Sequence, residues 1–169
     1  MTDSSTPLPK LVRDLMKVGV VTCSPDTSLK QLADLILEHN VEDVVVLDEG
    51  NAIGVVGQTE LVAAFSLPNY QSQTVYDIMR EELCQVPPEI PITTAVQIMQ
   101  DQNARTIFMM HNSNGIEYPA ASISYSHIMR LISADHKSDL NDLGIYAERK
   151  SPVEVFIERR ETARKRRLS

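Results

Sequence analysis

The sequence carries one order of features twice, and this duplication restricts the folds open to the chain more than any other property. Residues 12–16 (Val-Arg-Asp-Leu-Met) recur 63 residues later as residues 75–79 (Val-Tyr-Asp-Ile-Met). At the same offset the apolar run of residues 44–47 recurs at residues 107–110. One copy is too small to cover both faces of its own sheet, so we expect the two copies to pack against each other.

Each copy predicts the element order strand, helix, strand, strand, helix. In the first copy a strand is expected at residues 18–22, and the apolar period of residues 29–39 predicts an amphipathic helix. The Val-Val-Val-Leu run predicts a buried strand at residues 43–48. A further strand at 53–56 turns into a helix at 59–65, with Gly54 and Gly57 leaving the backbone uncovered. The fold class is therefore α/β, of the α+β type, with two β-α-β-β-α repeats.

A longer hairpin at residues 111–118 shifts the offset of the second copy to 67. Gly57 then corresponds to Ser124, and Glu60 corresponds to His127. Both pairs stand where a strand passes into a helix, and a helix N-terminus beside bare backbone can hold an anion or a hydroxyl. We consider this the candidate functional feature. The alternative is that Glu60 and His127 are ordinary residues of a first helical turn.

Composition and charge exclude several classes of function. Residues 1–150 hold 20 acidic and 10 basic residues, whereas residues 151–169 hold 3 and 6, so the body of the chain should repel nucleic acid. No apolar run approaches the length of a membrane span. The N-terminus lacks the features of a secretory signal, and the two cysteines suit a reducing environment, so we expect a cytoplasmic protein. The histidines show no metal-ligand spacing, and a Ser124–His127 nucleophile pair lacks a nucleophile elbow, so neither a metal site nor an enzyme is expected.

The duplicated unit resembles a tandem pair of CBS domains, the Bateman module, from about Pro9 to Asp135. The resemblance is carried by the Asp-Leu-Met and Asp-Ile-Met segments, the Pro-Asp-x-Ser-Leu helix entry, the Val-Val-Val-Leu-Asp strand and Gly54-Val55-Val56. It implies two repeats packed about a pseudo-twofold axis that form a homodimer. The predicted domains are a lead-in (1–9), a first CBS domain (10–66), a linker (67–74), a second CBS domain (75–135) and a C-terminal extension (136–169).

The resemblance also implies two clefts that bind an adenosine compound such as AMP, ADP, ATP or S-adenosylmethionine as a regulatory ligand. In the family, a Gly-apolar-apolar-Thr/Ser-x-x-Asp motif holds the ribose through its acid. The first repeat departs from the motif at Gly57 and has Glu60 as the acid, while the second keeps Ser124 and has His127 at the acid position. We regard the first cleft as the better preserved. The predicted nucleotide-binding residues are Thr22, Gly54, Val55, Val56, Glu60, Gln85, Arg105, Ile123, Ser124 and His127.

The C-terminal extension lies outside the resemblance. Ser151-Pro152 predicts the start of a helix that is apolar at first and then basic, ending in Arg164-Lys165-Arg166-Arg167. Two functions remain open. The chain is a stand-alone module that senses an adenosine compound and acts on a partner in trans, or it is a scaffold with degenerate clefts that docks a partner or a second subunit through the basic helix.

Overall fold

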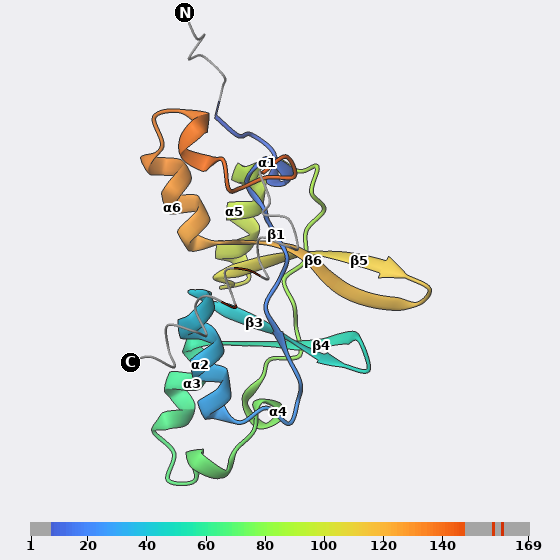
Figure 1. The fold of residues 1–169 in the computed structure, drawn as a ribbon, viewed down its shortest axis with the longest axis vertical. Helices are drawn as coiled ribbons and strands as arrows, with labels where there is room; N and C mark the ends of the chain where they lie inside the picture. The colour runs from blue at the N-terminus through green and yellow to red at the C-terminus, as the bar shows by residue number, and fades with distance from the viewer. Residues whose placement is uncertain (1–7, 148–156, 158–159, 161–169) are drawn as a thin grey trace, which may run out of the picture.

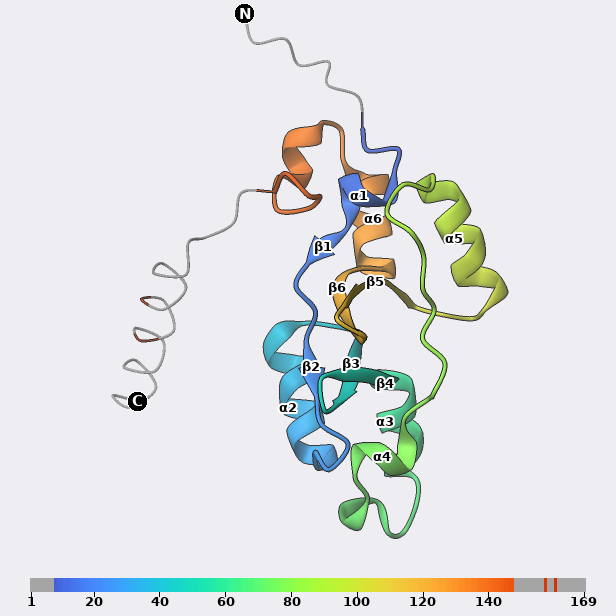
Figure 2. The ribbon, with the colours of Figure 1, turned by 90° about the vertical axis from the view of Figure 1, so that its right-hand side faces the viewer.

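The structure is a computed structural model that describes residues 8–147, 157 and 160. The two repeats lie one above the other along the long axis of the molecule, the first below and the second above (Figures 1 and 2). The α+β class and the duplicated arrangement are confirmed. The predicted C-terminal helix lies outside the described residues except for Ile157 and Arg160.

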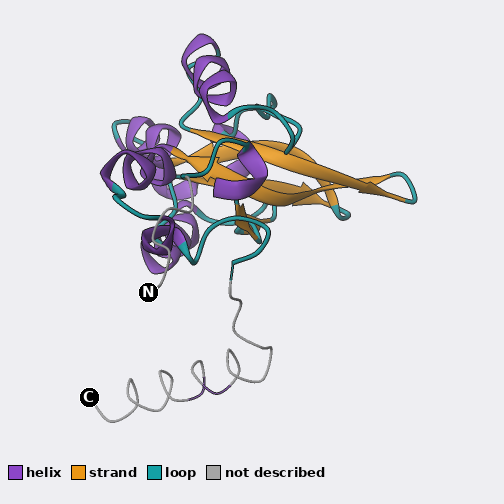
Figure 3. Ribbon diagram, turned by 90° about the horizontal axis from the view of Figure 1, so that it is seen from above, coloured by secondary structure: helices purple, strands orange, loops and turns teal. Residues whose placement is uncertain are grey.

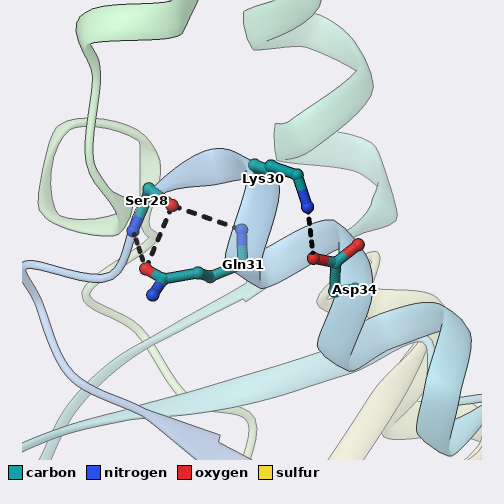
Figure 4. A network of polar contacts seen from close by, with 4 residues as sticks. All are labelled: Ser28, Lys30, Gln31 and Asp34. Carbon is teal, nitrogen blue, oxygen red and sulfur yellow. Dashed lines mark hydrogen bonds and ion pairs between the residues drawn. The ribbon is translucent and has the colours of Figure 1, made fainter. Parts of the chain in front are cut away.

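The first repeat forms a three-stranded sheet in the order β2-β3-β4. β2 (Thr22–Cys23) runs parallel to β3 (Asp43–Asp48), and β3 is antiparallel to β4 (Asn51–Gly57). The helices of this repeat are α2 (Leu29–His39) and α3 (Gln58–Phe65). α2 begins with a capping box between Ser28 and Gln31, in which Ser28 Oγ accepts from the Gln31 N–H at 3.3 Å (Figure 4).

The second repeat repeats this plan with longer strands. β5 (Thr106–Ser113) and β6 (Ile116–Ser124) form an antiparallel pair, flanked by α5 (Ile92–Asp101) and α6 (Tyr125–Ser133). Gln85 forms a parallel bridge to Phe108, in the position that β2 holds beside β3. Both hairpins extend to one side of the helices (Figure 3), and the Glu117 N–H donates to Asn51 Oδ1 at 3.3 Å between their ends.

Each repeat contributes its lead-in helix to the other repeat. α1 (Val12–Leu15) packs in the core around α5 and β6, whereas α4 (Val75–Ile78) packs against Leu32 and Val56 of the first repeat. The backbone follows the same exchange, because the Val12 N–H donates to Ile90 O at 3.0 Å and the Val75 N–H donates to Thr27 O at 2.9 Å. The two repeats are thus joined by reciprocal contacts and by a shared core of Val45, Val55 and Phe108 between the sheets.

The strand predicted at residues 18–22 is wrong as a single element. The chain instead forms β1 (Lys17–Val18), which pairs with β6 of the second repeat, and then β2, which pairs with β3. Gly19 separates them with a φ of +89°, a left-handed conformation that glycine adopts without strain. One segment therefore crosses from one sheet to the other.

The linker and the beginning of the C-terminal extension are also ordered. A 3₁₀ turn, η1 (Tyr70–Ser72), lies in the linker, and a second, η2 (Lys137–Leu140), follows α6. Leu140 and Leu143 are buried in the core of the second repeat, and the Gly144 N–H donates to Met16 O at 2.8 Å. The packed part of the molecule therefore continues through residue 145.

Candidate functional site

A cavity of about 280 Å³ lies between the two repeats, where β6 ends and α6 begins. Val20 and Val21 of the crossing segment and Val41 before β3 supply apolar walls, and the remaining lining is mainly polar. The polar residues come from both repeats: Lys17, His39, Asn40, Glu42 and Asp43 from the first, and Thr106, Ser122, Ser124, Ser126 and His127 from the second.

His127 lies in the first turn of α6 and caps that helix. Its Nδ1 accepts a hydrogen bond from the Ser124 N–H at 3.0 Å. Burial, with smaller contributions from the cations Lys17 and Arg130, lowers the pKa of His127 to about 4. The imidazole is therefore neutral near pH 7, and because Nδ1 accepts, the proton is on Nε2. His127 offers a hydrogen-bond donor where the family motif has a carboxylate.

Two serines and Glu42 form the wall beside His127. Ser124 Oγ lies 2.7 Å from Ser126 Oγ, and the Ser126 N–H donates to Glu42 Oε1 at 3.2 Å. The second bond joins a residue of the first repeat to the start of α6. Desolvation raises the pKa of Glu42, with the Ser126 N–H opposing the shift.

Asp43 and Thr106 bring unsatisfied polar atoms to the cavity. Only 7% of the Asp43 side chain is exposed; its Oδ1 lies 3.4 Å from Nη2 of Arg80. Asp43 Oδ2 and Thr106 Oγ1 are buried, and neither makes a hydrogen bond of good geometry among the described residues, although the Thr106 hydroxyl acts on the Asp43 carboxyl as a side-chain hydrogen bond that lowers its pKa. Desolvation raises the pKa of Asp43, although the neighbouring Thr106 and Arg80 oppose the shift. A bound molecule that reaches these atoms would satisfy them.

The pseudo-equivalent position in the first repeat holds an ion-pair cluster. Glu60 Oε2 accepts from the Gly57 N–H at 2.9 Å, and Oε1 lies 2.8 Å from Nε of Arg80. Arg80 also pairs with Asp43, so one guanidinium contacts both carboxylates. A Cβ atom at position 57 would lie 2.1 Å from Asp43 Oδ1, and that carboxylate therefore fills the space a side chain at 57 would need.

The predicted site residues lie in different surroundings. Ser124 and His127 line the cavity, and Glu60 lies in the ion-pair cluster. Val55, Val56 and Ile123 are core residues, with 3%, 0% and 0% exposure. Gly54 is buried where a Cβ would lie 2.6 Å from Arg80 O. Arg105 is exposed and acts electrostatically on Glu42 and Asp43, while Thr22 and Gln85 occupy their expected strand positions outside the cavity lining.

Sequence reasoning missed Lys17, Arg80, Asp43 and Thr106. The signal was present in the offset of 63, which pairs Lys17 with Arg80 and Asp43 with Thr106. These pairs differ in chemistry, so they did not stand out as repeats of one motif. The cavity described above lies on the Ser124–His127 side, and the expectation that the Glu60 side is the better cleft stays a prediction.

Among the described residues, no group of three or more His, Cys, Asp or Glu side chains is arranged to hold a metal ion. Over the same residues, no helix combines the length and the apolar character that crossing a membrane requires.

Comparison with known proteins identifies the repeats. The family model of the CBS domain matches residues 12–67 and 75–134. The CBS domain-containing protein YhcV of Bacillus subtilis is 26% identical over 104 residues, which cover 61% of this chain and 74% of YhcV. Protein MJ1426 of Methanocaldococcus jannaschii is 37% identical over 65 residues, which cover 38% of this chain and 39% of that protein.

Solved structures show the same fold. The CBS-domain protein ATU1752 of Agrobacterium tumefaciens superposes with a TM-score of 0.66 at 23% identity, covering 75% of this chain and 96% of that one. The CBS domain pair of MJ0100, solved with 5′-methylthioadenosine and S-adenosyl-L-methionine, gives a TM-score of 0.63 at 19% identity, covering 75% and 97%. The resemblance inferred from the duplicated sequence is confirmed.

Proposed function

The chain belongs to the CBS domain family, and on that premise we propose that it is a regulatory module that binds an adenosine compound between its repeats. The observation that carries the proposal is the cavity beside Ser124 and His127, which both repeats line. Its apolar valines suit a flat base, and its hydroxyls, Lys17 and His127 suit a ribose and its polar substituents. MJ0100, which shares the fold, was solved with two adenosine compounds.

Ligand binding has a route to the C-terminal extension. Lys17 lines the cavity directly after Met16, whose carbonyl accepts from the Gly144 N–H. Asp142 accepts from Arg130 of α6 at 3.0 Å, and its charge reaches His127. A ligand that moves β1 or α6 would therefore shift the start of the extension. We propose that the basic segment beyond it contacts a protein partner in trans, without catalysis by this chain and in the cytoplasm.

The proposed homodimer would form through the outer helices. Large apolar side chains are exposed on α2, α3 and α6, among them Leu37, Phe65 and Ile132 with 78%, 69% and 78% exposure. Such faces favour association with a second copy. Sedimentation velocity on the purified chain would test this, with a monomer at all concentrations counting against it.

Isothermal titration calorimetry with AMP, ADP, ATP and S-adenosylmethionine tests the proposed function. We expect at least one compound to bind, and we expect Ser122→Leu, which places a larger side chain on the cavity wall, to weaken that binding. Ser113→Leu is the matched control, because Ser113 is exposed at the end of β5 and away from the cavity. No heat from any of the four compounds at millimolar concentration would contradict a sensor.

The second candidate is a scaffold that binds a partner without a ligand, and the ion-pair cluster at Glu60 favours it because Arg80 already pairs with Glu60 and Asp43 there. It predicts ligand-independent capture of a partner that requires the basic segment. The truncation that tests this should end after Ala147, because ending at Asp135 would remove Leu140 and Leu143 from the core.

A further inference from the structure

We propose that the chain takes one ligand, in the cavity beside Ser124 and His127, and that Asp43 selects a nucleoside that presents a hydroxyl or an amine, not a phosphate, to the cavity floor. This inference rests on the proposed function and adds to it the number of sites and the residue that determines specificity.

The buried polar atoms of the cavity define what the ligand must supply. Asp43 lines the cavity with a side chain that is 7% exposed, and its Oδ2 has no hydrogen-bond partner among the described residues. Thr106 Oγ1 is also buried in the lining without a hydrogen bond of good geometry, and its nearest effect is on the Asp43 carboxyl itself, so the two residues form one polar pair at the floor. Leaving a buried acceptor unpaired is costly, so a ligand donor placed there gains more than it would at an exposed group.

The groups at the floor disfavour phosphate. Glu42 lines the cavity next to Asp43, so two carboxyl groups of the first repeat face the same space. Lys17 is the lysine of the lining, and Arg80 and Arg105, which lie outside the lining, act on these carboxyl groups, Arg80 on Asp43 and Arg105 on both. These cations already act on the carboxyl groups, and at Asp43 Oδ2 itself a phosphate oxygen would set one acceptor against another, whereas a ribose hydroxyl or an amine would donate to it.

The cleft on the Glu60 side is filled because the two repeats carry different residues at two equivalent positions. The first repeat has Asp43 with Gly57, and the corresponding residues of the second repeat are Thr106 and Ser124. In the first repeat Asp43 Oδ1 lies 2.1 Å from where a Cβ at residue 57 would be. A carboxylate from β3 therefore takes the volume that the side chain of Ser124 takes in the second repeat.

Arg80 completes the filled cleft. Its guanidinium lies 2.8 Å from Glu60 Oε1 and 3.4 Å from Asp43 Oδ1, and Glu60 also caps α3. Its counterpart Lys17 has no ion pair among the described residues. A ligand on the Glu60 side would have to break these ion pairs, whereas the Ser124–His127 side offers an open cavity.

Calorimetry with the full chain tests both parts. Adenosine is titrated against the wild type, Asp43→Asn and Thr106→Val, together with 2′,3′-dideoxyadenosine, which lacks the 2′- and 3′-hydroxyl donors, inosine, which lacks the amine donor, and AMP. We expect one adenosine per chain and tighter binding of adenosine than of AMP. Asp43→Asn should weaken adenosine binding about 10- to 100-fold, and Thr106→Val should weaken it less.

The analogues identify the donor that Asp43 accepts. At least one of dideoxyadenosine and inosine should bind the wild type about 10- to 100-fold more weakly than adenosine, and that loss should largely disappear in Asp43→Asn. Heteronuclear NMR spectra of both variants check that they are folded; if Asp43→Asn is not, Thr106→Val supplies the comparison, because it removes one hydroxyl and keeps the side-chain shape.

The outcomes separate the two proposals. Two ligands per chain, AMP binding tighter than adenosine, or analogue losses that persist in the variant would overturn this inference and leave the proposed function standing. Absence of binding by every adenosine compound would overturn both.

Discussion

The two clefts are built on the same backbone frame and differ in the side chains that enter it. On one side Glu60, Arg80, Asp43 and Gly57 form a closed cluster, and on the other His127, Lys17, Thr106 and Ser124 border a cavity. Both helices nevertheless start with the same contact. The Gly57 N–H donates to Glu60 at 2.9 Å, and the Ser124 N–H donates to His127 at 3.0 Å.

This difference shows that the helix cap and the ligand site can separate after duplication. A carboxylate and an imidazole both accept a backbone N–H, so either one starts the helix. Only the groups facing them across the cleft, from β3 or β5 and from the lead-in segment, decide whether the space is filled by protein. The comparison thus locates specificity on Asp43 and Arg80 and not on the motif residues themselves.

The largest expected effect comes from giving the first repeat a side chain at residue 57. Gly57→Thr places Cβ against Asp43 Oδ1, so the buried carboxylate must move, and we expect a loss of about 3 kcal/mol or more in the free energy of unfolding. Adding Asp43→Thr, which brings the first repeat close to the Thr106–Ser124 pair, should recover the part of the loss that the carboxylate causes, while Glu42 O, 2.5 Å from the new Cβ, still has to move. Urea unfolding of both single variants and the double variant measures the coupling.

Asp43→Thr alone is the control for this cycle, because it removes the carboxylate without filling position 57. If the Asp43 carboxylate takes the space of a side chain at residue 57, the double variant should be clearly more stable than Gly57→Thr. Equal stability of the two would show that Glu42 O, the next atom near the new Cβ at 2.5 Å, determines the clash instead.

A smaller effect distinguishes the two helix caps by pH. Because the pKa of His127 falls to about 4 on folding from an ordinary value of 6.5, the unfolded chain binds the proton first as pH decreases. Stability should therefore decline between these two values, by at most about 3 kcal/mol. His127→Gln keeps an acceptor for the Ser124 N–H and does not titrate, so it should lack this decline.

Urea unfolding at about pH 7.5 and about pH 4.5 compares the two proteins. The raised pKa values of Glu42 and Asp43 stabilise the folded chain as pH falls, but both carboxyls are present in each protein and largely cancel in the difference. An identical pH dependence for the wild type and His127→Gln would mean that His127 titrates normally.

The fold was predictable where a pattern repeats over several residues. The duplication placed the paired strands, since Val44, Val45 and Val46 are all fully buried, and the amphipathic period located α2. It did not reveal that α1 and α4 exchange repeats, because a four-residue apolar turn fits either core. Leu140 and Leu143 were missed for the same reason.

The site was predictable only in part. The strand-to-helix turns at Glu60 and His127 could be found because glycine and helix-start residues mark them. Which turn borders a cavity depends on Asp43, which pairs with Gly57 on the neighbouring strand. The Val-rich sequence around Asp43 does not reveal that its carboxylate lies where a side chain at residue 57 would be. To predict such a contact, one must know which residues of the two strands face each other, and local sequence does not supply that register.

A further prediction compares the two cations of the clefts. Arg80→Met leaves the buried Asp43 without its guanidinium, and we expect a loss of about 1–2 kcal/mol in unfolding free energy, reduced by the partial exposure of Arg80. Lys17→Met is the matched variant and should change stability by less than about 0.5 kcal/mol, because Lys17 is exposed and has no ion pair among the described residues. Similar losses would contradict the asymmetry.

The smallest expected effects lie at the starts of α2 and α5, the first long helix of each repeat. Ser28 caps α2 through a capping box with Gln31, whereas Pro91 precedes α5 without a side-chain cap (Figure 4). Ser28→Ala should therefore cost about 1 kcal/mol. Lys30→Ala, which removes only the exposed ion pair with Asp34 one turn on, should cost about 0.3–0.5 kcal/mol in thermal unfolding. If both cost the same, the cap is not what starts α2, and its buried face of Leu29, Leu32 and Ile36 holds the helix, as the buried face of α5 must already do without a side-chain cap.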